Sequence, residues 1–236
     1  PSPHGLLWTE GRPQEGGRTV IVLRTDKGDE KDLTPAPFNV RTRVHEYGGG
    51  AWLLHEDTLY FSNFADQQIY TVSVFGGEPI ALTSNVNLRF ANGTVDARRN
   101  RIIYVVEDHS QLTQNQNSEP ENKLACIDIQ TGEVSSLSCG HDFYSSPTLS
   151  EDGNCLAWIT WDHPNMPWDD TTLWQADFND AGDLMTPRAI AGGTGISVQQ
   201  PAFGPGNQLH FVSDQSGWWN LYKIDDGGTA INLCPM

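Results

Sequence analysis

The sequence lacks the short motifs that identify most catalytic chains. It contains no G-x-S-x-G pentapeptide for a serine nucleophile, no Walker loop, no dinucleotide fingerprint and no HExxH zinc motif. It also has no convincing amphipathic helix of the length that an α/β-hydrolase domain requires. We therefore expect no catalytic residue, no metal and no cofactor in this chain.

Basic residues and long apolar runs are scarce as well. Lys and Arg number 14 against 30 Asp and Glu, which gives a formal net charge of -16. A field of that sign repels phosphate backbones and anionic membrane surfaces. No stretch reaches the ~18 to 20 apolar residues of a membrane helix. We therefore expect neither nucleic-acid nor membrane partners, and a cytoplasmic location is the default prediction.

Cysteine is also sparse. The four cysteines, Cys126, Cys139, Cys155 and Cys234, have no CxxC spacing. Buried reduced thiols are the favoured interpretation, because a disulfide framework belongs to small secreted domains. A bond between Cys126 and Cys139 stays open, since both lie on predicted adjacent strands.

What the sequence does contain is turn residues, 23 Gly and 14 Pro, arranged between short strand patterns. The stretch from Gln200 to Ile224 predicts a strand ending at Phe203, a Gly-Pro-Gly-Asn turn, and strands over 208–213 and 219–224. A fourth strand is predicted over 229–233. Four antiparallel strands joined by tight turns are typical of one blade of a β-propeller.

The same pattern recurs along the chain. Apolar anchors of the second strand lie about 43 to 54 residues apart, at Leu6, Leu59, Ile102, Leu156 and Leu209. Repeats of about 40 to 50 residues indicate a propeller. We therefore predict an all-β fold, one β-propeller of about five four-stranded antiparallel blades. The blades are expected at residues 4–38, 48–84, 88–140, 144–193 and 198–236 of a single domain.

Residues 39–52 are the most unusual segment in composition. Arg43, His45 and Glu46 precede three consecutive glycines, which allow a close approach by a ligand or by another strand. One interpretation is a loop that presents these three side chains to a substrate. The other is a bend between blades in which Arg and Glu pair with each other, and position alone favours the bend, because most charged loop residues are not ligands.

Two other segments have competing interpretations. In the insert 161–171, Asp162, His163, Asp169 and Asp170 suggest a metal cluster, but a packed loop whose carboxylates cap turns fits the prolines and tryptophans better. The aromatic segment from Asp214 to Tyr222 suggests a ligand platform. Its alternation favours instead a strand that packs between neighbouring blades.

Three segments resemble one family. RVHEYGGGAW at 43–52, WDHPNMPWDDTTLW at 161–174 and VSDQSGWWNLY at 212–222 are similar to the propeller of prolyl oligopeptidase family serine peptidases, in the acylaminoacyl-peptidase or dipeptidyl-peptidase-like branch. The resemblance implies a propeller of seven or eight blades that covers a hydrolase domain and limits access to short peptides. Arg43, His45 and Glu46 match the family's motif and are the substrate-binding candidates.

The resemblance leads to a functional prediction. The chain, which begins Pro-Ser-Pro without Met, is expected to be part of a larger ring. Its partners would be peptide substrates and an α/β-hydrolase domain that lies outside it. Exposed blade edges would allow self-association. One alternative is a free-standing TolB-like propeller that binds proteins. Another is a complete five-bladed glycosidase, which would need acidic residues on several first strands, but the first strands of this chain contain almost none.

Overall fold

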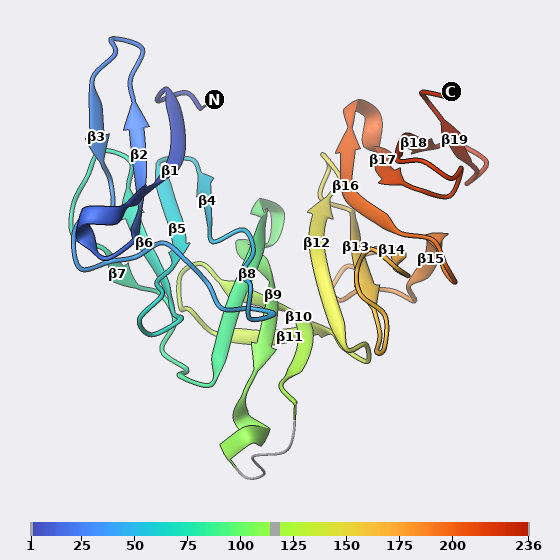
Figure 1. The fold of residues 1–236 in the computed structure, drawn as a ribbon, viewed down its shortest axis with the longest axis horizontal. Helices are drawn as coiled ribbons and strands as arrows, with labels where there is room; N and C mark the ends of the chain where they lie inside the picture. Colours follow the sequence, from blue (N-terminus) through green and yellow to red (C-terminus); the bar gives the residue numbers. More distant parts are fainter. Residues whose placement is uncertain (1, 114–118, 236) are drawn as a thin grey trace. The chain divides into compact units, whose positions relative to one another are not determined.

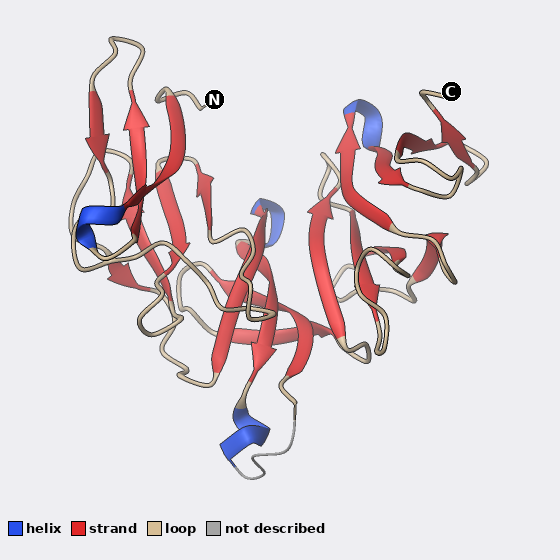
Figure 2. Cartoon of the chain, in the orientation of Figure 1, coloured by secondary structure: helices blue, strands red, loops and turns tan. Residues whose placement is uncertain are grey.

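The computed structural model describes residues 2–113 and 119–235, and β-strands form most of its regular structure (Figure 1, Figure 2). The strands form five antiparallel sheets in chain order. The first sheet has three strands and the other four have four each. The predicted all-β propeller of about five blades is confirmed, with a shorter first blade.

The first two sheets hold the N-terminal strands. The first contains β1 (Leu6–Arg12), β2 (Arg18–Arg24) and β3 (Glu30–Asp32). The second contains β4 (Trp52–His55), β5 (Thr58–Ser62), β6 (Ile69–Ser73) and β7 (Ile80–Ala81).

The third sheet has the order β11-β10-β9-β8. Its strands are β8 (Leu88–Asp96), β9 (Arg101–Asp108), β10 (Glu121–Asp128) and β11 (Val134–Ser138). The polar insert 108–122 begins at the end of β9 and includes the 3-10 helix η3 (Ser110–Thr113), while its residues 114–118 lie outside the described part of the chain.

The last two sheets hold the C-terminal strands. The fourth contains β12 (Phe143–Leu149), β13 (Cys155–Trp161), β14 (Thr172–Asp177) and β15 (Arg188–Gly192). The fifth contains β16 (Val198–Gly204), β17 (Gln208–Ser213), β18 (Asn220–Ile224) and β19 (Ala230–Asn232).

Short 3-10 helices mark three of the turns, and the last of them lies in the Gly-Pro-Gly-Asn turn that the sequence predicts. They are η1 (Pro13–Glu15), η2 (Ala97–Arg99) and η4 (Pro205–Asn207). In η4, Gly206 has a φ of 72°, a left-handed conformation that glycine adopts without steric cost. Among the described residues, no helix has the length and apolar character needed to cross a membrane.

The chain divides into two compact units, and the boundary runs through the third sheet. Unit 1 comprises Pro1–Gly93, Val106–Pro120 and Ile129–Glu133, and unit 2 comprises Thr94–Val105, Glu121–Asp128 and Val134–Met236. Each unit has its own apolar core. In unit 1 the core lies between the first two sheets and includes Ile21, Leu33 and Phe61, and in unit 2 it lies between the last two and includes Ile159 and Phe211.

Two buried threonines close the first two sheets in the same way. Thr34, just after β3, accepts a hydrogen bond from the Ile21 N–H at 3.0 Å, and Thr83, just after β7, accepts one from the Ile69 N–H at 3.0 Å. Each hydroxyl satisfies a backbone donor that would otherwise be buried without a partner. The repeat is therefore present in individual hydrogen bonds as well as in strand order.

The fifth sheet corrects one sequence interpretation. β18 alternates as predicted, with Asn220 and Tyr222 buried. The opposite face carries Trp219 and Leu221, which are 49% and 41% exposed. The strand is therefore packed on one face, not sandwiched between two neighbours, because the described chain places no further sheet against it.

The cysteine prediction holds in part. All four cysteines are free, and only Cys126 and Cys155 are buried. Burial raises the pKa of both thiols to about 11, which makes them poor nucleophiles at neutral pH. Cys139 and Cys234 are exposed, contrary to the expectation that the thiols are buried.

Candidate functional site

The segment 39–52 runs from the first sheet to the second and lies wholly in unit 1. Val40, Thr42 and Val44 are buried, while Arg41 and Arg43 are exposed. This alternation is that of an extended chain, whose successive side chains point to opposite sides. The local sequence therefore directs both arginines away from the core.

Both arginines lie against one aromatic ring. The guanidinium carbon of Arg41 is 4.6 Å from the centroid of Phe64, and that of Arg43 is 4.3 Å away. Phe64 follows β5, and the buried Gln67 side chain accepts a hydrogen bond from the Arg43 N–H at 2.8 Å. Cation-π contact and this backbone anchor hold the two positive charges in place.

A buried carboxylate organises the second half of the segment. Glu107 of β9 is only 3% exposed, and it accepts a hydrogen bond from the His45 N–H at 2.5 Å. Its other oxygen lies 3.5 Å from Arg89 and 3.0 Å from the His109 ring. A buried carboxylate requires partners of this kind, because its desolvation is costly. Glu107 thus fixes the backbone at His45.

Arg89 links the buried carboxylate of Glu107 to the exposed carboxylate of Glu46. Its Nη1 lies 3.2 Å from Glu46, and it donates to the Arg43 carbonyl at 3.4 Å. His45 and Glu46 have φ values of 55° and 63°, a left-handed conformation that is uncommon outside glycine. The turn is therefore held in an uncommon conformation by a network from β8 and β9.

The three glycines bring the chain close to β8. A Cβ on Gly50 would lie 2.7 Å from the Asn92 Oδ1, and the Gly50 N–H donates to that atom at 2.6 Å. Gly48 has a φ of 88°. Glycine adopts the φ of Gly48 without steric cost, and a Cβ at Gly50 would displace the Asn92 amide from its hydrogen bond. Gly49 and Gly50 approach the neighbouring strand β8, and all three glycines also line a cavity.

A cavity of about 560 Å³ opens over this segment. Its lining includes Arg41, Arg43, Glu46 and Phe64, together with Thr9 of the first sheet. Pockets that hold small ligands are commonly about 300 to 1,000 Å³. The cavity has positive charge from two arginines and a negative charge from Glu46.

The structure places the three predicted residues differently. Arg43 and Glu46 both line the cavity, whereas His45 is not among its lining residues. Arg and Glu of the segment do not pair with each other in the described structure, since Glu46 pairs with Arg89. Sequence reasoning omitted Arg41 from the candidates, although its spacing of two from Arg43 in an extended segment was a usable signal.

The insert 161–171 bears out its prediction only in part: Asp169 caps a turn, but the loop is not packed, since Trp168 is 62% exposed. Asp169 accepts a hydrogen bond from the Met166 N–H at 3.0 Å. Asp162 accepts hydrogen bonds from the Asp142 N–H at 2.7 Å and from the His141 ring at 2.8 Å. Burial acts to raise the pKa of Asp162, but these hydrogen bonds outweigh it and lower that pKa. The described residues contain no group of three or more His, Cys, Asp or Glu suited to hold a metal ion.

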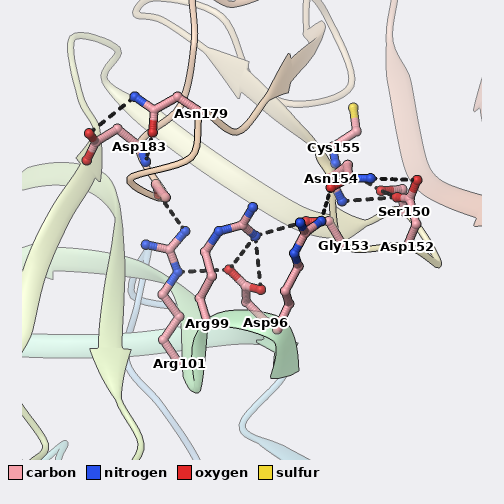
Figure 3. Close-up of polar contacts among 12 residues, drawn as sticks. Asp96, Arg99, Arg101, Ser150, Asp152, Gly153, Asn154, Cys155, Asn179 and Asp183 are labelled. Atoms are coloured by element: carbon pink, nitrogen blue, oxygen red, sulfur yellow. Dashed lines mark hydrogen bonds and ion pairs between the residues drawn. The ribbon is translucent and has the colours of Figure 1, made fainter.

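A second polar cluster lies in unit 2 (Figure 3). Asp96, at the end of β8, is fully buried and pairs with Arg99 at 3.1 Å and with Arg101 at 2.8 Å. The two arginines also lie over the Phe178 ring, with centroid distances of 4.2 and 5.1 Å. No sequence motif indicated this cluster.

The arginines of this cluster reach two turns of the fourth sheet. Arg99 donates to the Gly153 carbonyl at 2.9 Å, and Arg101 donates to the Gly182 carbonyl at 2.8 Å. In the first of these turns, hydrogen bonds from the Asn154 N–H and the Ser150 hydroxyl lower the pKa of Asp152 to about 2. The cluster joins a hairpin of the third sheet to the turns of the fourth, and its role is structural.

Five antiparallel sheets repeated in chain order, each built by local hairpins, define a β-propeller. No protein-family model matches the sequence, and no curated protein sequence matches it. Solved structures do. The crystal structure of a puromycin hydrolase is 32% identical with a TM-score of 0.89, over 100% of this chain and 38% of that chain. A puromycin-hydrolyzing peptidase of Mycobacterium tuberculosis is 31% identical with a TM-score of 0.88, over 100% and 38%.

This chain belongs to the propellers of the prolyl oligopeptidase family of serine peptidases. It spans about 38% of the length of these two solved relatives. TolB from Acinetobacter baumannii is 14% identical with a TM-score of 0.58, over 97% of this chain and 51% of that chain. That likeness extends to the fold alone, so the TolB-like alternative has weaker support.

Proposed function

We propose that this chain is the non-catalytic propeller part of a serine peptidase and that it restricts access of short peptides to a hydrolase domain. The observation that carries the proposal is the 32% identity to a puromycin hydrolase over the whole of this chain. A rigid propeller selects by size, because folded proteins do not pass a narrow opening, while a few polar groups hold the admitted peptide.

Within this function, the cavity at residues 39–52 is the proposed peptide-binding site. Glu46 is the proposed contact for a protonated peptide amine, because its side chain is 84% exposed at the cavity and its partner Arg89 leaves one carboxylate oxygen available. Arg43 is the proposed contact for acceptor groups of the peptide. His45 would position the turn through its backbone bond to Glu107.

The test compares the full natural protein containing this sequence with the 236-residue chain alone. Both are assayed with N-blocked and free aminoacyl and dipeptidyl chromogenic substrates. We expect hydrolysis only by the full protein, and its loss after treatment with a serine-directed phosphonate. Activity of the chain alone would overturn the non-catalytic assignment, and inactivity of both would favour a TolB-like binding propeller.

Size selection has its own measurement in the same assay. We expect the full protein to cleave a short peptide and to leave the same sequence intact within a folded protein. Unfolding that protein should expose a cleavable end. Equal cleavage of the folded and the short substrate would contradict the gating role while leaving the family assignment intact.

We further propose that the chain associates with a second copy through the fifth sheet. Apolar side chains gather on β18, on the edge strand β19 and beside them, namely Trp218, Trp219, Leu221, Ile231 and Leu233. In the fourth sheet the central strand β13 is buried along its whole length by neighbours from the same chain. A sheet of a second copy is the surface whose chemistry matches this one.

Sedimentation velocity over a concentration series tests this association. We expect the average mass to rise with concentration, and Leu221→Asp to hold the chain monomeric, because a charge in an apolar interface is costly. Val86→Asp, at an exposed position elsewhere, is the matched control and should leave the association unchanged. A strictly monomeric chain at all concentrations would contradict the proposal.

A further inference from the structure

We propose that Arg41 and Arg43, held on Phe64, form a receptor for a carboxylate of the bound peptide. The inference deepens the proposed function and rests on it for the identity of the ligand as a peptide. The carboxylate site itself rests on charge and geometry within unit 1.

The first observation is charge without a counter-ion. Acidic residues outnumber basic ones by 30 to 14, and several arginines of the described chain pair with carboxylates, including Arg12, Arg18 and Arg89. Among the described residues, no carboxylate lies within 4.0 Å of the guanidinium nitrogens of Arg41 or Arg43. Arg98 and Arg188 also lack a carboxylate partner, but they donate to the amide oxygens of Asn154 and Gln175. Among the described arginines, the guanidinium groups of Arg41 and Arg43 therefore stand apart in having neither kind of acceptor, and an anionic ligand would supply one.

The second observation is convergence. Both guanidinium carbons lie within 4.6 Å of the centroid of one phenyl ring. Two like charges held near one ring repel each other, and an anion bound beside them in the cavity reduces that cost. Guanidinium groups are planar forks that match the two oxygens of a carboxylate, and contact with the ring limits their motion before the ligand arrives.

The third observation is the place of the pair. Both arginines line the cavity of about 560 Å³, and Glu46 lines it as well. A short peptide carries a negative carboxylate and a positive amine, so it complements a cavity with charges of both signs. We therefore assign the carboxylate to the arginine pair and the amine to Glu46. The same receptor chemistry would accept the carboxylate of an acidic side chain.

Binding is measured on the full natural protein, treated with a serine-directed phosphonate so that no ligand is cleaved. Isothermal titration compares triglycine, triglycine amide and the amide of Gly-Glu-Gly. We expect triglycine to bind at least tenfold more tightly than its amide. Recovery of affinity by the glutamate peptide amide would assign the site to side-chain carboxylates as well, and no recovery would assign it to the chain end. Equal affinity for all three would overturn the inference.

Single substitutions locate the receptor. Arg41→Gln and Arg43→Gln should each weaken triglycine binding by about tenfold and leave the amide unchanged, since one charged hydrogen-bonding partner is lost. Arg43→Lys keeps the positive charge but lacks the planar guanidinium fork. Its affinity for triglycine should therefore lie between that of the parent protein and that of Arg43→Gln. Arg24→Gln, in β2 with an exposed side chain, is the matched control and should bind as the parent does.

The outcomes separate this inference from the proposed function. If the protein shows no peptidase activity but binds triglycine through Arg41 and Arg43, the carboxylate receptor stands and the peptidase assignment fails. If it is an active peptidase whose affinity for triglycine is unaltered by both glutamine variants, the receptor fails and the peptidase assignment stands. Absence of any measurable triglycine binding also overturns the receptor.

Discussion

Replacing Asp96 by alanine is expected to lower the free energy of unfolding by about 3 to 5 kcal/mol, the usual cost of removing one partner from a buried ion pair. The Asp96 side chain is completely buried, and it neutralises two arginines that are themselves largely buried. Without it, Arg99 and Arg101 would remain as adjacent cations over the Phe178 ring. Their contacts with the turns at Gly153 and Gly182 would weaken as well.

Urea denaturation measures this effect, with the shift in midpoint converted through an unchanged slope. Asp96→Asn should cost less, because the amide keeps the shape and part of the hydrogen bonding. The matched control is Asp32→Ala. That carboxylate, 42% exposed, pairs with Arg12 at 2.7 Å, and an exposed pair contributes only about 0 to 1 kcal/mol. Equal losses in the two alanine variants would show that the buried cluster does not stabilise unit 2.

Replacing Trp158 by alanine is expected to cost about 3 to 5 kcal/mol, because the change removes a large apolar side chain and leaves a cavity in a packed interior. Trp158 lies in the middle of β13, opposite Trp174 of β14, and is 2% exposed. Every residue of β13 is buried, so the neighbouring sheets have little room to collapse into the space.

The matched control for this substitution is Trp168→Ala, in the insert that precedes β14. Trp168 is 62% exposed, so its removal should change the free energy of unfolding by less than about 0.5 kcal/mol. Thermal unfolding followed by circular dichroism distinguishes the two variants. A loss at Trp168 as large as that at Trp158 would indicate that the insert, not β13, anchors this part of unit 2.

The strand order of this protein follows from local sequence. The prediction of a strand over 208–213 coincides with β17 (Gln208–Ser213), and the predicted third strand over 219–224 matches β18 but for one residue. Turn residues such as Gly206 and the alternation of apolar residues act over a few positions, and each hairpin pairs neighbours in the chain. Such local interactions can be predicted from a short stretch of sequence, without knowledge of the remaining chain.

Some residues of the candidate site could be predicted from local sequence in the same way. Segment 39–52 was recognised by composition, and Arg43 and Glu46 do line the cavity. The placement of His45 was not predictable, because its backbone partner, Glu107, is distant in the chain. Whether the three residues contact substrate stays a prediction, as do the blade boundaries and the cytoplasmic location.

The sequence by itself determined the all-β class, the repeated hairpins and the family resemblance, because these depend on residues close together in the chain. Only the tertiary structure decided which side chains meet. It brought Arg41 and Arg43 onto Phe64, buried Glu107 beneath the turn at His45, and left Trp219 and Leu221 uncovered. These outcomes depend on the packing of one sheet against another, in which residues distant in sequence become neighbours and desolvation decides their partners.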